Sequence, residues 1–193
     1  MFQWTEFLTY AIATAVTTGP NNIMSMSNAG RLGLKKSLPF NMGIWVGFSI
    51  VMVLCTLFCS MLSQIIPIIQ TPMLIIGAVY MLYLAWKTFK SGSEITEDHS
   101  REGFVSGLTL QFVNPKIYIY GIVSMEAYVL PVYHGNLLPL LFFALLLAFI
   151  GFVCNLLWSG FGSALRRLFS RHAKAINTVM ALLLVWCAVS LFL

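Results

Sequence analysis

The chain has 193 residues, of which 59% are hydrophobic and only 9% are charged, whereas soluble domains carry about a quarter charged residues. Its net charge of +5 comes from basic residues at the ends of apolar segments rather than from one patch, which argues against a nucleic-acid partner and is typical of the loops of a membrane protein. The composition therefore excludes an ordinary soluble domain and indicates an integral membrane protein in the lipid bilayer.

Apolar segments of about 20 residues recur along the chain, long enough as helices to cross about 30 Å of hydrocarbon. Lipid offers the backbone no hydrogen bonds, so only helices or closed barrels can span it, and these segments lack the alternation of barrel strands. We expect a single all-α transmembrane domain over residues 1–193. Its six helices are expected at about 5–28, 38–62, 65–88, 104–129, 136–161 and 174–193.

Lys and Arg residues are concentrated in the first, third and fifth loops and are missing from the second, the fourth and both termini. By the positive-inside rule the odd-numbered loops are cytoplasmic, so both termini are predicted to face the periplasm. The longest loop, at about residues 90–103, is then cytoplasmic. Lys116 is the one basic residue that topology does not explain.

The two halves of the chain share a plan of three spans each. The first span of each half is interrupted by an Asn/Pro cluster, Gly19-Pro20-Asn21-Asn22 in one and Asn114-Pro115-Lys116 in the other. Because three is odd, the second half must enter the membrane in the opposite direction. We therefore expect two inverted three-helix repeats, at about 1–90 and 104–193, with a binding site where the broken helices meet.

The first cluster combines a helix break with polar side chains. Pro20 lacks an N–H group and kinks a helix. Gly19 removes side-chain bulk and lets the backbone deviate, and Asn21 and Asn22 supply donors and acceptors. One interpretation is a substrate site. The alternative is a packing kink whose amides bond to neighbouring helices.

The second cluster contains Gln111, Asn114, Pro115 and Lys116. Lys116 lies about 12 residues into its span, roughly 18 Å deep, where a charge is costly and usually marks a functional site. It could pair with a substrate carboxylate or change its protonation during transport. The alternative is that its long side chain extends toward the cytoplasmic surface.

Two further polar residues are weaker candidates. Glu126, near the outer end of its span, could serve proton coupling or contact a substrate ammonium group, or could simply be a carboxylate facing water. Asn41 either lines the substrate path or makes an interhelical hydrogen bond. His99, His134 and His172 fall in loops without carboxylates or cysteines at ligand spacing, so we expect no metal and no cofactor.

Four cysteines, Cys55, Cys59, Cys154 and Cys187, lie in apolar segments. Cys55 and Cys59 share one helix face, which leaves open a membrane thiol-disulfide oxidoreductase. They lack Cys-X-X-Cys spacing and a nearby charge that would activate a thiol, so packing is the favoured interpretation. A non-transporting subunit of a larger complex is the other alternative.

Several motifs resemble the LysE/RhtB family of bacterial amino-acid exporters over the whole chain. They are Thr18-Gly19-Pro20-Asn21-Asn22, Gly30-Arg31-x-Gly33, Gly43-xxx-Gly47 and Gln111-Phe-Val-Asn114-Pro115-Lys116. Leu110–Asn114 and Ala181–Val185 look closest to the cysteine/O-acetylserine exporter branch. Thr18 departs from the family pattern, which usually has Pro there.

The resemblance implies a secondary exporter of small neutral amino acids in the bacterial inner membrane, driven by the proton gradient and working by alternating access. It implies no enzymatic activity, and the chain has no Walker motif for direct use of ATP. The substrate-binding residues are then expected to be Asn21, Asn22, Asn41, Gln111, Asn114 and Lys116. Lys116 and Glu126 are the candidates for coupling to protons.

Overall fold

The computed structural model describes residues 2–90 and 99–192, and every regular element in these ranges is helical. The helices, in chain order, are α1 Trp4–Val16, α2 Pro20–Leu32, α3 Leu34–Leu57, α4 Cys59–Lys90, α5 His99–Val113, α6 Pro115–Ser124, the π-helical turn η1 Met125–Val129, α7 Leu130–Tyr133, α8 Leu137–Ala164, α9 Arg166–Arg171 and α10 Ala173–Val189. The predicted all-α class is confirmed for this part of the chain. Most of the loop expected at 90–103 lies outside the described residues.

Among the described residues, α3 and α8 are long and apolar enough to cross a membrane, and α10 is a shorter apolar helix. The two spans that the sequence predicted to be broken are each divided: α1 and α2 share 5–28, while α5, α6 and η1 share 104–129. The other three predicted spans correspond to α3, α4 and α8, and α10 covers most of the last one. The six membrane crossings themselves stay a prediction.

Proline determines where the second half of each broken helix begins. Pro20 is the first residue of α2 and Pro115 is the first residue of α6. Proline is favoured at this position because the first helical N–H has no intrahelical partner, and the same ring prevents the preceding helix from continuing. A proline therefore marks the point at which each of the two spans is divided.

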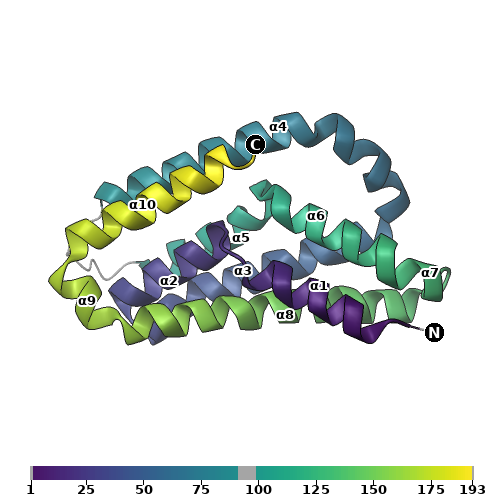
Figure 1. Cartoon of the computed structure of the whole chain (residues 1–193), viewed down its shortest axis with the longest axis horizontal. Helices are drawn as coiled ribbons and strands as arrows, with labels where there is room; N and C mark the ends of the chain where they lie inside the picture. The colour runs from purple at the N-terminus through teal and green to yellow at the C-terminus, as the bar shows by residue number, and fades with distance from the viewer. Residues whose placement is uncertain (1, 91–98, 193) are drawn as a thin grey trace.

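Figure 1 shows α4 and α10 side by side along one edge of the molecule, with α8 along the opposite edge. The ends of α2, α4 and α8, the starts of α3 and α10, and the whole of α9 gather at one end, far from α7. Most of the basic side chains belong to these termini and to α9. The basic residues that the sequence places in the odd-numbered loops therefore lie mostly at one end of the folded chain.

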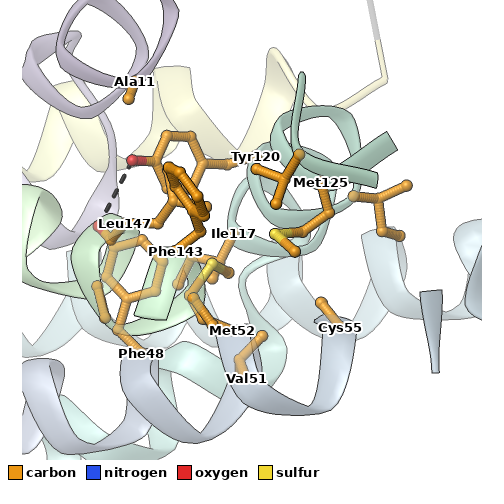
Figure 2. Packing of buried hydrophobic residues seen from close by; sticks show 14 of the residues in the cluster. Ala11, Phe48, Val51, Met52, Cys55, Ile117, Tyr120, Met125, Phe143 and Leu147 are labelled. Atoms are coloured by element: carbon orange, nitrogen blue, oxygen red, sulfur yellow. Dashed lines mark hydrogen bonds between the residues drawn. The ribbon is translucent and has the colours of Figure 1, made fainter. Parts of the chain in front are cut away.

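The buried apolar side chains form two clusters. The α1 cluster joins α1, α6, η1, the second half of α3 and the first half of α8. The α10 cluster joins α10, α2, the first half of α3 and the second half of α4, together with Leu110 of α5 and Phe169 of α9. Trp158 of α8 packs against it. Figure 2 shows Tyr120 within the α1 cluster, beside Phe143, with its hydroxyl donating to the Leu147 carbonyl at 3.5 Å.

Polar residues lie between the two clusters along the broken helices. In the first half, Ala11 belongs to the α1 cluster and Ile23 to the α10 cluster, and the Gly19–Asn22 break lies between them. In the second half, Leu110 belongs to the α10 cluster and Ile117 to the α1 cluster. The 111–116 segment separates them. Each break therefore interrupts the apolar packing at the same level.

Glycines allow α3 and α5 to touch through their backbones. A Cβ at Gly43 would clash with the Phe104 carbonyl oxygen, and a Cβ at Gly107 would clash with the Phe40 carbonyl oxygen. Small residues allow such close approach between membrane helices, where there is no hydrophobic drive for association. The Gly43-xxx-Gly47 and Gly103-xxx-Gly107 pairs are therefore packing features.

This contact generates a stability prediction. Gly43→Ala should destabilise the protein by about 1–3 kcal/mol, the usual effect of overpacking, because the clashing atoms belong to backbone that cannot move aside. Gly160→Ala is the matched control, since nothing lies within 4 Å of a Cβ there. Thermal unfolding in detergent, followed by tryptophan fluorescence, measures both. Equal midpoints for the two variants would contradict this packing.

Candidate functional site

A pocket of about 400 Å³, counting its open mouth, lies between the two helix breaks. Its polar wall contains six of the residues predicted from sequence: Gly19, Pro20, Asn21, Asn22, Asn114 and Lys116. Phe48 and Tyr120 supply an apolar wall, and Gly151 and Asn155 of α8 complete the enclosure. Two motifs half the chain apart in sequence are therefore brought to one cavity.

The last carbonyls of α1 accept hydrogen bonds from side chains instead of from a further helical turn. The Asn22 amide donates to the Ala15 carbonyl at 2.9 Å and to the Thr17 carbonyl at 2.8 Å. The Trp158 indole N–H donates to the Val16 carbonyl at 3.2 Å. These bonds matter because the final carbonyls of a helix have no intrahelical donor.

Lys116 adds a charged donor at the same place. Its ammonium donates to the Thr17 hydroxyl at 2.8 Å and to the Thr17 carbonyl at 3.3 Å. A cation is favoured there, since a helix C-terminus carries partial negative charge. The side chain thus lies across the first break and does not extend away from it.

A reciprocal amide pair joins the two breaks. The Asn21 amide nitrogen donates to the Gln111 side-chain oxygen at 2.8 Å, and the Gln111 nitrogen donates back to the Asn21 oxygen at 3.2 Å. The Gln111 nitrogen also donates to the Gly107 carbonyl at 2.8 Å. Gln111 is fully buried, so it supports the Asn21 wall from behind.

The helices that begin at the two breaks have different N-termini. The Asn114 side chain caps α6 by accepting from the Lys116 backbone N–H at 3.2 Å. Gly19, the residue before α2, has no side chain to do the same. The first turn of α2 therefore lines the pocket without a side-chain cap, and uncapped backbone donors at a helix start attract anions.

Gly19 is needed for space and not for backbone freedom. Its φ of −170° and ψ of 171° are those of extended backbone, which any residue adopts. A Cβ at this position would lie 3.3 Å from the Lys116 ammonium and 3.6 Å from its Cδ. The backbone leaves the helical conformation at Gly19, and the absent side chain leaves room for Lys116.

A second polar network lies deeper, between α2, α3 and α8. The Ser25 hydroxyl donates to the Asn41 side-chain oxygen at 2.8 Å, and the Asn41 amide donates to the Ser159 hydroxyl at 2.8 Å. The Ser25 hydroxyl also lies 3.4 Å from the Asn155 side-chain oxygen. Asn41 is fully buried and outside the pocket wall, so it makes the interhelical bonds that were its alternative role.

The remaining candidates are placed elsewhere. Glu126 is exposed on η1 and does not line the pocket. Cys55, Cys154 and Cys187 are buried thiols, and the side chain of Cys59 lies outside the described residues.

Sequence reasoning did not single out Ser25, Ser159, Thr17 or Trp158. The four-residue spacing of Asn155 and Ser159 places both on one face of α8 and could have identified that polar face.

A family model, LysE type translocator, matches residues 12–193. The chain belongs to this family. A cysteine/O-acetylserine efflux protein of Klebsiella pneumoniae is 41% identical over 184 residues, covering 95% of this chain and 93% of that protein. Proteins with the same description from Salmonella typhimurium and Escherichia coli K12 are 38% and 37% identical, each covering 96% of this chain and 95% of its own length. No solved structure matches.

Membership defines the general class of the chain. It is a multi-pass membrane transport protein of the LysE family and not an enzyme. The broken helices, the polar pocket and the buried amides described above are therefore parts of a transporter.

The amide pair generates a prediction that tests the link between the two breaks. Asn21→Ala and Gln111→Ala should each destabilise the protein by about 1–3 kcal/mol, because each leaves a buried amide without its partner. The double variant should be more stable than the sum of the two effects implies. Ser49→Ala combined with Gln111→Ala is the control, because the Ser49 hydroxyl donates to the Trp45 carbonyl of its own helix and is not part of the amide pair. Strict additivity for Asn21 and Gln111 would show that the pair is not formed.

Proposed function

We propose that this protein exports small neutral amino acids or their derivatives, of the cysteine and O-acetylserine type, across the bacterial inner membrane. The observation that carries the proposal is that both helix breaks meet at one pocket lined by amides and by Lys116. The relatives described as cysteine/O-acetylserine efflux proteins cover nearly the whole chain, which supports a shared substrate class.

The pocket offers complementary groups to a zwitterion. Asn21, Asn22 and Asn114 supply amide donors and acceptors, and Lys116 supplies a positive charge for the carboxylate. The uncapped first turn of α2 favours the same carboxylate. Phe48 and Tyr120 leave an apolar region for a short side chain. Gln111 acts through Asn21 and not by direct contact with the substrate.

Transport is proposed to occur by alternating access between two inverted repeats. One repeat comprises α1 to α4 and the other α5 to α10, so that the breaks at Pro20 and Pro115 correspond. In this proposal the chain crosses the membrane six times, with both termini in the periplasm and the basic end of the molecule in the cytoplasm. Proton coupling is assigned to Lys116, with Glu126 as the second candidate.

The oxidoreductase alternative has lost its basis, because the family is one of transporters. A non-transporting subunit is the alternative that a transport assay still has to exclude.

The first test is counterflow in liposomes. The purified protein, reconstituted with unlabelled O-acetylserine inside, should accumulate labelled O-acetylserine and cysteine from outside. Lys116→Ala should lower the rate at least tenfold, which corresponds to about 1.4 kcal/mol. Lys35→Ala removes a charge from an exposed position at the start of α3 and should leave the rate unchanged. Absence of counterflow by folded protein would overturn the exporter proposal.

The cysteines give an independent test. A variant with Ala at all four cysteine positions should retain counterflow, because the three described thiols are buried and none of them lines the pocket. Its thermal stability should fall modestly from the lost side-chain volume. Loss of transport in a variant that still folds would restore a role for the thiols.

A further inference from the structure

We propose that, when no substrate is bound, the Lys116 ammonium occupies the subsite that receives the ammonium group of the substrate. This inference rests on the exporter function proposed above and specifies which group of the substrate binds where. The subsite lies at the C-terminal end of α1, where the carbonyl and hydroxyl of Thr17 accept hydrogen bonds from the ammonium. Lys116 is the exchangeable donor.

The carbonyls at the end of α1 are held by three side-chain donors of different character. Asn22 donates its amide from the next helix, and Trp158 donates its indole N–H from α8. Both donor groups are neutral, and their short or rigid side chains restrict their movement. Lys116 alone carries a charge, on a flexible stem of four carbons. It is therefore the donor that another cation would replace.

Lys116 also has the space that an exchange requires. Gly19 lies against the ammonium and contributes no side chain. Thr17 is exposed, and Lys116 itself is only partly buried. The ammonium can thus leave Thr17 without first moving a packed neighbour.

The exchange balances charge only for a zwitterion. The substrate ammonium takes over the Thr17 carbonyl and hydroxyl, and the released Lys116 pairs with the substrate carboxylate near the start of α2. An amine without a carboxylate would displace Lys116 and leave the charge of this partly buried side chain unpaired. A carboxylate without an amine would draw Lys116 away and leave the end of α1 without its charged donor. Selectivity for α-amino acids follows.

Cysteine and its two half-molecules make the experiment. Cysteamine lacks the carboxylate and 3-mercaptopropionate lacks the amine, while all three keep the thiol. Dissociation constants are measured for each from ligand-dependent thermal stabilisation of the purified protein in reducing buffer. The proteins are wild type, Lys116→Met, Lys116→Arg and the control Lys35→Met.

Wild type and Lys35→Met should bind cysteine at least tenfold more tightly than either half-molecule. In Lys116→Met the vacated subsite should bind cysteamine about tenfold more tightly than wild type does, while cysteine binding weakens about tenfold. Lys116→Arg keeps the charge and should therefore retain the wild-type order of affinities, with cysteine bound more tightly than either half-molecule. A cysteamine affinity that is unchanged or weaker in Lys116→Met overturns the inference.

A second variant covers the case in which Lys116→Met does not fold. Gly19→Val keeps the lysine but crowds its ammonium away from Thr17, and it should also tighten cysteamine binding. Gly160→Val is its control, at a position with open space around it. Unchanged cysteamine binding in Gly19→Val would count against the inference. Counterflow of cysteine by the wild-type protein distinguishes failure of this inference from failure of the exporter proposal. If counterflow is present, unchanged cysteamine binding in the variants overturns only the assignment of the subsite. If counterflow is absent, the exporter function is overturned too.

Discussion

The structure depends on which groups form hydrogen bonds with the backbone at the two points where a helix is broken inside this membrane protein. Lipid cannot bond the carbonyls at the end of α1, so donors must come from the protein itself. Asn22, Trp158 and Lys116 provide them. At the start of α6, the Asn114 side chain accepts a hydrogen bond from the Lys116 backbone N–H. Asn22, Asn114 and Lys116 also line the pocket, so the proposed binding site uses side chains that also stabilise the breaks.

The apolar packing is arranged around this polar level. The α1 cluster and the α10 cluster are joined through α3 and α8, which run past both, while the broken helices change cluster at their breaks. Tight backbone contact at Gly43 and Gly107 fixes α3 to α5. In the proposed alternating-access motion, the broken helices would bend at Pro20 and Pro115, where their own backbone is interrupted.

Much of the fold could be read from the sequence, but the contacts across it could not. The Pro20 and Pro115 breaks follow from the chemistry of proline, and the apolar runs predict α3 and α8 closely. The partners of Asn22 and Lys116 depend on how α1, α6 and α8 meet, which no local pattern encodes. Gly19 shows the difference most clearly: the sequence indicates that glycine removes side-chain bulk and lets the backbone deviate, but the fold is needed to show that Lys116 uses the space.

The central claim is that the substrate binds between the two helix breaks. Anomalous diffraction from crystals grown with selenocysteine would locate the substrate by its selenium atom. The account predicts a single strong peak in the pocket, beside Phe48 and Tyr120 and within a few ångströms of Asn114 and Lys116. A peak outside this pocket, for example next to Glu126, would contradict the account and transfer the transport site to another part of the molecule.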